Sequence, residues 1–450
     1  MKKAITAWRK RCWDMNTGNR ELFYQRCREY FGDRAEVFIG LLTAESRAGF
    51  FLNEKKAARE KILDLIDFPY ESSPLTDKSF NCDIDGIGKT RAYDLGVIYP
   101  QDIESSLPAS FVDCADVKLA IDLCAAPGGK SVNILNRMAD DALLIANDVS
   151  YKRASVLSGN LERLGLDNCM VTSLKPEHFL NDFRESFDLV ILDAPCSGEG
   201  MIRKYPQILD EYSLAGIASL AKIQSGLLDV AHGLLNEGGQ LLYSTCTYAF
   251  EEDEEQIASF LELHQDMELI SLPHTDNSSK LEGTVKLSPL NGTEGQFMAL
   301  LRKKGSLRHR NIRYARTVKN DLVNAFIKEN LRIDEYCLYK RDERYYLSFA
   351  PLPDIRNGVL NEGIYIGRVI NGRFEPSHSL YRANSLKSRY VHVCDLNDEE
   401  YDRYIGGNEL KKDLKDAFYL ITYKDLSLGY ARCSKGTLKN KYPKGLRRVV

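Results

Sequence analysis

The chain has 450 residues, enough for two or three domains of ordinary size. Hydrophobic residues make up 44% and charged residues 28%, the balance of a soluble globular protein. The formal net charge of -3 excludes binding of a polyanion through bulk positive charge, so nucleic-acid contacts would require local basic patches. The apolar runs are shorter than the ~20 residues of a membrane-spanning helix, and no signal-peptide core follows Met1. These features predict a cytoplasmic protein without a membrane segment.

Cysteine and histidine usage argues against disulfides and metals. The chain has 11 cysteines, and this odd number in a cytoplasmic protein does not suggest a disulfide framework. There is no C-x-x-C pair, and the seven histidines lack ligand-like spacing, so we predict no metal site. Most cysteines are interpreted as small buried apolar residues. Cys196 and Cys246 are the exceptions, because each ends a predicted strand.

Residues 1–75 are predicted to be a mostly helical accessory region. Apolar residues recur at helical spacing in 19–31, 34–42 and 54–66. Basic residues are frequent near the start of the chain, and they fit either a solvated helical face or a contact with RNA. The polar, turn-rich stretch 72–88 indicates a linker into a central domain.

Residues 76–305 alternate between predicted strands and helices. The strands are expected at 119–123, 143–147, 170–174, 187–192, 240–244 and 297–301. One helix is expected to begin at Ser131 and another at Tyr151. A third is expected to end near Leu235, and a fourth to span 251–264. This alternation predicts a parallel sheet with helices on both faces. Ligands of such sheets bind beyond the carboxyl ends of the strands.

The first predicted strand ends in a small-residue turn, and Lys130 and Ser131 then open a helix. Gly128 and Gly129 let the backbone approach a ligand closely, and the helix N-terminus presents free N–H groups. The spacing matches neither G-x-G-x-x-G nor the P-loop, so the turn alone predicts only a nucleotide-like ligand. Asp148 follows the second strand, where it could accept hydrogen bonds from ribose hydroxyls or act as a helix N-cap.

Two further strands end in cysteines, within LVILDAPC (189–196) and QLLYSTCT (240–247). Cys196 and Cys246 at neighbouring strand ends would point into one cleft, together with Asp193. A disulfide between them is the alternative, which a cytosolic location disfavours. A cleft cysteine can act as a nucleophile or as an acid–base group if a cation stabilises its thiolate. The candidate cations are Lys130, Arg203 and Lys204.

Residues 306–450 are predicted to form a basic linker and a small, mostly β RNA-binding domain. The segment 302–319 contains eight Lys or Arg and no acid, and 432–448 contains seven and no acid. Contacts with phosphates dominate affinity for nucleic acids, so both segments suit RNA. A solvated linker without contacts remains the alternative for the first segment.

The motifs DLCAAPGGKS, LDAPCSGEGM and YSTCTY, in this order, resemble the Sun-type (NSUN) family of RNA cytosine-C5 methyltransferases, which use S-adenosylmethionine. The segment GTEGQFMALLRK resembles the closing strand of that family. RFEPSHSL and LGYARCSKGTLKNKYPKGLRR resemble the RNA-binding extension of the bacterial RsmF-type enzymes, which act on small-subunit (16S) ribosomal RNA. The resemblance covers most of the chain. It implies an α/β, Rossmann-like methyltransferase domain followed by a PUA-like domain.

The resemblance also implies roles for the site residues. Cys246 would attack C6 of cytosine, Cys196 would assist the later elimination, and Asp193 would hydrogen-bond N3 or the amino group. The implied cofactor contacts are Cys124, Ala125, Ala126, Pro127, Gly128, Gly129 and Lys130 around the methionine part, Asp148 at the ribose, and Arg153, Lys175 and Asp193. The family usually has an acid or amide near the adenine, where this chain has Ser173 and Lys175. Either Lys175 has a different role, or backbone and apolar contacts hold the adenine.

The expected partner is ribosomal RNA, either naked or within the small ribosomal subunit, and the protein is expected to be a monomer. Methylation of tRNA and a non-catalytic role in ribosome assembly are the alternatives. Retention of both cysteines, Asp193 and the glycine turn argues against a pure binding protein. A nicotinamide dehydrogenase is disfavoured by the absence of G-x-G-x-x-G.

Overall fold

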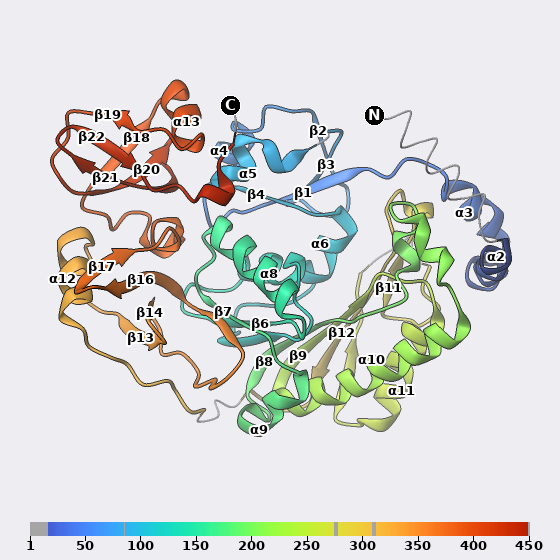
Figure 1. Cartoon of the computed structure of the whole chain (residues 1–450). Helices are drawn as coiled ribbons and strands as arrows, with labels where there is room; N and C mark the ends of the chain where they lie inside the picture. Colours follow the sequence, from blue (N-terminus) through green and yellow to red (C-terminus); the bar gives the residue numbers. More distant parts are fainter. Residues whose placement is uncertain (1–16, 85, 274–277, 308–311, 449–450) are drawn as a thin grey trace.

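The computed structural model describes residues 17–84, 86–273, 278–307 and 312–448 (Figure 1). Its centre is a nine-stranded sheet with the order β10-β12-β9-β8-β5-β6-β7-β15, in which β11 also pairs with β12. The parallel strands are β5 (Leu119–Asp122), β6 (Leu143–Asn147), β7 (Cys169–Thr172), β8 (Phe187–Asp193) and β9 (Leu235–Thr245). The antiparallel strands are β10 (Met267–Ile270), β11 (Val285–Leu287), β12 (Gln296–Lys303) and β15 (Val359–Glu362).

The predicted Rossmann-like core is confirmed, because all six expected strands are present and five of them are parallel. The last expected strand, β12, runs antiparallel to β9. Successive residues of each strand face opposite sides of the sheet. Ala120 and Leu144 pack on one side, whereas Ile121 and Ile145 pack on the other. Burial on both faces explains why these strands are continuous apolar runs.

Helices cover both faces of this sheet. The first side carries α6 (Ile103–Ser110), α7 (Gly129–Leu135) and α8 (Tyr151–Leu164), and the second carries α9 (Leu180–Phe183), α10 (Leu214–Leu234) and α11 (Glu254–Leu263). Among the described residues, α10 alone has the length and apolar composition to cross a membrane. The sequence-based expectation of no such run therefore misses α10. Leu228 and Leu234 of this helix pack in the core beneath the sheet.

The N-terminal region is helical only in its first part. Helices α2 (Thr17–Phe31) and α3 (Ala35–Leu41) confirm the first two expected helices, whereas α4 is confined to Arg59–Leu63. A four-stranded antiparallel sheet follows, made of β1 (Ala48–Leu52), β2 (Tyr70–Ser72), β3 (Ser79–Cys82) and β4 (Ile98–Pro100). This sheet crosses the boundary expected at residue 75. The short run GFFL has no periodicity that separates strand from helix, and pairing with β3 and β4 decides its structure.

The C-terminal part is mostly β, as expected, but it contains two sheets. The first sheet comprises β13 (Cys337–Arg341), β14 (Arg344–Ser348), β16 (Ile364–Ile370) and β17 (Arg373–Pro376), next to α12 (Asp321–Asn330). The second comprises β18 (Val393–Leu396), β19 (Leu410–Lys411), β20 (Phe418–Tyr423), β21 (Leu426–Ser434) and β22 (Thr437–Asn440), with α13 (Asp398–Ile405). Strand β15 lies between β14 and β16 in the chain, yet it pairs with β7 of the central sheet (Figure 1).

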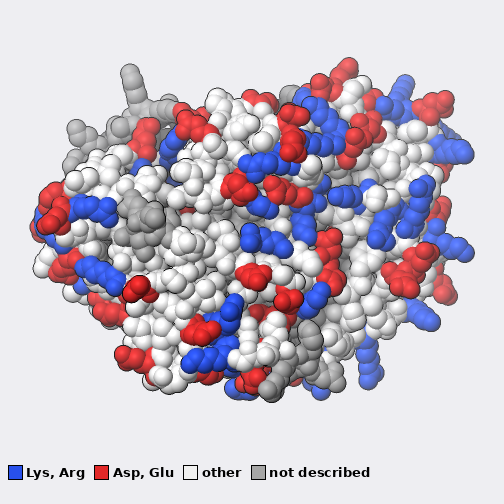
Figure 2. All heavy atoms as spheres, turned by 180° about the vertical axis from the view of Figure 1, so that it is seen from behind, with Lys and Arg blue, Asp and Glu red and all other residues white. Residues whose placement is uncertain are grey.

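The basic segments have partly structural roles. Lys303 is 5% exposed, donates to the Leu235 carbonyl at 3.2 Å and forms an ion pair with Glu185. Arg448 forms an ion pair with Asp94. The buried Lys303 side chain is therefore not available to RNA, and the Arg448 side chain is held by Asp94. Arg308 and Arg310, and the basic residues at the start of the chain, lie outside the described residues. Figure 2 shows Lys and Arg more densely on the side of the C-terminal sheets, with acids interspersed.

Candidate active site

The glycine turn joins β5 to α7 at the carboxyl edge of the sheet. Gly128 has φ +123°, a conformation that side chains disfavour, and a Cβ there would lie 3.0 Å from Leu157 Cδ1. A Cβ on Gly129 would lie 2.8 Å from Gln101 Nε2. The turn thus requires glycine at 128, whereas a side chain at 129 would have to displace the Gln101 amide.

A buried acid, not singled out in the sequence, supports the turn from below. Asp122 is fully buried, and Ser131 Oγ at the start of α7 donates to its Oδ2 at 2.7 Å. Burial raises the pKa of Asp122 to about 7, against the opposing effect of the Ser131 hydrogen bond. In the sequence, the position of Asp122 at the start of the motif DLCAAPGGKS is the feature that could have indicated this role.

Asp148 lies after β6, as expected, and it retains an oxygen for a ligand. The backbone N–H of Ser150 donates to Oδ1 at 2.9 Å. Oδ2 is 3.4 Å from Arg153 Nη2 and accepts no hydrogen bond from the described residues. Arg153 Nη2 also donates to the Ala126 carbonyl, which links Asp148 to the turn. Ser150 is the N-cap of α8, so the N-cap alternative for Asp148 does not hold.

The structure brings Asp193, Cys196 and Cys246 together. Asp193 lies beside Ser244 in the register of β8 and β9, and Ser244 Oγ donates to Asp193 Oδ1 at 2.6 Å. Lys130 Nζ is 3.0 Å from Asp193 Oδ2. The Sγ atoms of Cys196 and Cys246 are 3.3 Å apart, far beyond the ~2.05 Å of a disulfide, and both thiols are free.

The two thiols differ in acidity. The hydrogen bond from Cys196 lowers the pKa of Cys246, and Lys130 acts in the same direction, while burial and Asp193 oppose them. The same hydrogen bond, together with burial, raises the pKa of Cys196. Cys246 is therefore the thiol that more readily becomes a thiolate.

Of the three candidate cations, Lys130 is at the thiols and the other two are engaged elsewhere. Arg203 donates to the carbonyls of Thr293 at 3.1 Å and Glu45 at 2.7 Å. Lys204 forms an ion pair with Asp102. The sequence could not separate these roles, because all three residues follow motif turns.

A buried acid, Glu252, holds the loop of the first cysteine. It is 0% exposed, and its Oε2 accepts from the Ser197 backbone N–H at 3.0 Å and from Gln224 Nε2 at 2.8 Å. Burial raises its pKa. Glu252 lies in the acidic run EEDEE, which in the sequence resembles a solvated face and does not indicate a site residue.

A second buried acid, Glu199, links the two cysteine loops. Its Oε2 accepts from Thr247 Oγ1 at 3.1 Å and from the Tyr248 backbone N–H at 3.0 Å, and its Oε1 accepts from Tyr212 at 2.8 Å. Thr247 Oγ1 is also 2.7 Å from Ser197 Oγ. These contacts fix residues adjacent to both cysteines. In the sequence, the position of Glu199 in the motif CSGEG, three residues after Cys196, is the feature that could have indicated this role.

The region expected near an adenine is bordered by backbone. Lys175 has an exposed side chain just before a 3₁₀ turn at Pro176–Phe179. The Ser173 backbone N–H donates to the Gly358 carbonyl at 2.7 Å, beside strand β15. The chain that closes this region thus comes from the C-terminal part, which the sequence did not indicate.

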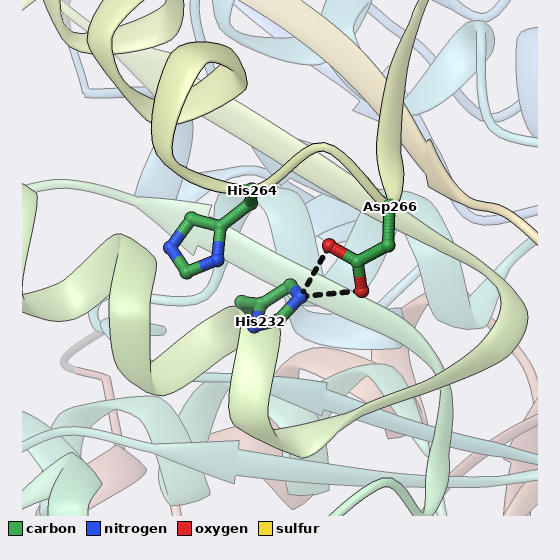
Figure 3. A group of neighbouring side chains, drawn as sticks. All are labelled: His232, His264 and Asp266. Carbon is green, nitrogen blue, oxygen red and sulfur yellow. Dashed lines mark hydrogen bonds and ion pairs between the residues drawn. The ribbon is translucent and has the colours of Figure 1, made fainter.

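A group of possible metal ligands lies outside this site. His232, His264 and Asp266 each place a ligand atom within 4.8 Å of the others (Figure 3). His232 Nε2 is 2.9 Å from Asp266, and His264 Nε2 is 2.9 Å from Asp229. Histidine spacing did not predict this cluster, because its members are 32 residues apart and meet only in the fold. The hydrogen bonds of the two imidazoles with Asp266 and Asp229 already explain why these side chains lie close together.

Comparison with known proteins agrees with this geometry. A family model described as "16S rRNA methyltransferase RsmB/F" matches residues 110–302, and "Methyltransferase RsmF PUA domain" matches 391–448. Ribosomal RNA small subunit methyltransferase F of Salmonella schwarzengrund (strain CVM19633) is 30% identical over 390 residues, which cover 80% of each chain. The protein of that name from Erwinia tasmaniensis is 27% identical over 448 residues, covering 92% of this chain and 93% of the relative.

Solved structures show the same catalytic fold. A methyltransferase homologue from Pyrococcus horikoshii is 29% identical with a TM-score of 0.55, over 63% of this chain and 94% of that chain. NSun6 from Pyrococcus horikoshii, solved with SFG, has a TM-score of 0.56 over 63% of this chain and 98% of that chain. At 20% identity, this second likeness shows the fold alone.

The site offers what S-adenosylmethionine requires. Oδ2 of Asp148 accepts no hydrogen bond from the described residues, and a ribose hydroxyl could supply one. Together with the two family models and the 30% identical relative, these features make the assignment. The chain belongs to the RsmB/F family of S-adenosylmethionine-dependent 16S rRNA methyltransferases and carries the RsmF-type PUA domain.

Proposed function

We propose that this rRNA methyltransferase modifies C5 of cytosine through a covalent bond between Cys246 and C6 of the base. The observation that carries the proposal is the pair of free thiols, 3.3 Å apart, beside the ion pair of Asp193 with Lys130. All four groups lie at the carboxyl edge of the sheet, where ligands of this fold bind. A protein that only bound RNA would need neither thiol.

A nucleophile is needed because C5 of an aromatic cytosine reacts poorly with a methyl sulfonium. The Cys246 thiolate attacks C6, and the C5=C6 electron pair becomes available at C5 as in an enamine. Asp193 accepts a hydrogen bond from the amino group or from protonated N3, which orients the ring. S-adenosylmethionine, when bound, supplies the electrophilic methyl group.

Release requires removal of the C5 proton. Its C–H electron pair re-forms the C5=C6 bond, the C6–S bond breaks, and the sulfur electron pair returns to Cys246. Cys196 adjoins Cys246, so its thiolate, once formed by proton loss to solvent, is placed to accept this proton.

The chain's own groups would hold the cofactor at the turn. We assign residues 124–130 to its methionine part and Asp148, linked to the turn through Arg153, to its ribose. Exposure of Lys175 favours backbone and apolar contacts for the adenine. We expect the enzyme to act as a monomer in the cytoplasm, on rRNA that is either naked or assembled in the small subunit.

The chemistry is tested by a pair of cysteine variants incubated with 16S rRNA and S-adenosylmethionine. Cys196→Ala should accumulate a covalent RNA–protein adduct, visible as a shifted band on a denaturing gel, because C6–S cleavage is slowed. Cys246→Ala should give neither adduct nor product while still binding RNA. Normal turnover by Cys246→Ala would contradict the proposed nucleophile.

The substrate is tested by bisulfite sequencing of rRNA and tRNA from cells with and without this protein. The proposal predicts a protected cytosine in 16S rRNA that disappears on deletion. Loss of protection only in tRNA would identify tRNA as the substrate, and no change in either would favour an assembly role.

A further inference from the structure

A cleft of about 520 Å³ lies where helix α8 meets the end of the PUA domain. Its walls come from α5 (Arg91–Leu95), from α8 and from residues 442–448, and His378 and Arg382 lie between them. Sites for small ligands have volumes of about 300–1,000 Å³. The described lining residues include neither of the two cysteines nor the glycine turn, so the cleft is separate from the active site.

The inner part of the cleft is cationic. Arg382 is 1% exposed and donates to the carbonyls of Ser427 at 2.7 Å and Asp94 at 2.9 Å, but its Nε has no hydrogen-bond partner among the described residues. The guanidinium of Arg163 stacks 3.7 Å from the centroid of Tyr93, and its Nε and Nη2 also lack hydrogen-bond partners there. Burial lowers the pKa of both arginines, that of Arg163 to about 10.

Nearby carboxylates do not satisfy these donors. Asp94 uses one oxygen for Arg448 and accepts from the Tyr401 hydroxyl at 2.9 Å with the other. Glu162 also lines the cleft, and burial raises its pKa, against the opposing effects of a hydrogen bond with Ser379 and the charge of Arg382. Buried cations with unsatisfied donors are costly. The three unpartnered nitrogens are closed off from solvent, but both guanidinium groups belong to residues that line the cleft, and their charge suits an oxygen-rich anion such as a phosphate.

The rim of the cleft is apolar and open. Val156 on α8 is 54% exposed and Leu446 on the opposite wall is 51% exposed, although both are aliphatic. Gly159 and Gly445 have open space where a Cβ would project. A flat ring can therefore lie against the rim while a phosphate lies on the side of the cleft that the two arginines line.

We propose that this cleft binds one nucleotide of the RNA outside the target cytidine, with its phosphate at Arg163 and Arg382 and its base against Val156 and Leu446. The inference rests on RNA being the substrate. The cleft is mechanically linked to the active site, because Asn160 of α8 donates to the Pro127 carbonyl of the glycine turn at 3.0 Å. A nucleotide held here would set the register of the RNA relative to the cysteines.

The test places a carboxylate at the rim, where it would repel a phosphate. Leu446→Glu and Val156→Glu should each weaken binding of a 16S rRNA transcript about tenfold, the scale of one lost nucleotide contact. Affinity for S-adenosylmethionine and the melting temperature should be unchanged. Leu263→Glu is the matched control, since Leu263 is 73% exposed on α11 and should tolerate the change.

Photocrosslinking of the wild-type complex adds an independent measurement. A 16S rRNA transcript containing 4-thiouridine should crosslink to peptides from α8 or from residues 442–448. The inference would be overturned if both rim variants bound RNA as tightly as the control variant Leu263→Glu. It would also be overturned if the crosslinks were confined to other peptides. The two proposals fail separately. If Cys196→Ala formed no adduct, only the cysteine chemistry would be contradicted, because the RNA affinity of the rim variants is measured without methylation.

Discussion

Asp193 is the residue at which the two halves of the active site meet. One carboxylate oxygen faces Lys130 of the glycine turn, and the other accepts from Ser244, two residues before Cys246, the proposed nucleophile. The charge of Lys130 therefore serves two groups, since it pairs with Asp193 and lowers the pKa of Cys246. A single buried ammonium thus acts on both the Asp193 carboxylate and the Cys246 thiol.

Asp122 gives a pH dependence that can be measured at the scale of one residue. Its pKa in the folded state is about 7, above the ordinary value of 3.8. As the pH rises, Asp122 therefore loses its proton in the unfolded chain before it does so in the folded protein. Its contribution to folding stability is fully present below pH 3.8 and is lost as the pH rises towards 7. Relative to Asp122→Asn, the wild type should lose about 1.4 kcal/mol per pH unit across this window.

Urea denaturation of both proteins at several pH values between 4 and 8 measures the difference. Asp141→Asn is the control, because hydrogen bonding to Lys118 lowers the pKa of Asp141 and confines its effect to more acidic solutions. Parallel stability curves for wild type and Asp122→Asn would contradict the assigned burial effect.

At the scale of elements, the loops after β8, β9 and before β12 form one block. The Gly200 backbone N–H donates to the Cys246 carbonyl at 2.9 Å, and the Gly295 N–H donates to the Gly200 carbonyl at 3.1 Å. Helices α2 and α3 pack over this block through Phe23 and Phe38, in a cluster that includes Tyr248. The N-terminal helices thus support the cysteine loops from outside.

Gly295→Ala should separate these loops. The added Cβ would lie 2.4 Å from the Gly200 Cα and 2.8 Å from the Tyr248 ring, so backbone must shift. We expect a loss of about 1–3 kcal/mol in unfolding free energy, as for other overpacked sites, and a lower rate of methylation. Gly226→Ala on α10 is the control, because nothing lies within 4 Å of its added Cβ. Equal stability of the two variants would show that the loops adapt.

At the scale of the whole molecule, the two ends of the chain share one core. Phe50 and Leu95 of the N-terminal sheet region belong to the same hydrophobic cluster as Tyr401 and Leu428 of the PUA domain. Strand β15 pairs with the edge strand β7, and Lys56 Nζ donates to the Arg382 carbonyl at 3.1 Å. These contacts fix the two C-terminal sheets relative to the central sheet (Figure 1).

Deletion of residues 306–450 should therefore destabilise the catalytic part as well as remove RNA contacts. The β7 edge and the apolar face around Phe50 would both be exposed to solvent. We expect a lower melting temperature and weaker S-adenosylmethionine binding, measured by calorimetry. A truncated chain with unchanged melting temperature and cofactor affinity, but weaker RNA binding, would show that the C-terminal part is an independent module.

The sequence by itself determined the catalytic domain, because its information is local. Continuous apolar strands, a glycine turn and two strand-end cysteines are short patterns, and parallel strands bring their carboxyl ends to one edge of the sheet. The structure confirms that Asp193, Cys196 and Cys246 meet at this edge.

Only the tertiary structure decided the remaining features, because each depends on residues distant in sequence. Strand β1 lies in a region whose sequence predicts mostly helix, since its pairing with β4 lies outside any local window. The same holds for β15 on β7 and for the buried acids Glu199 and Glu252, which resemble surface residues in the sequence. Periodicity indicates which face of a helix or strand is apolar. Which element packs on that face, and which acids become buried, depends on the packing of the whole chain.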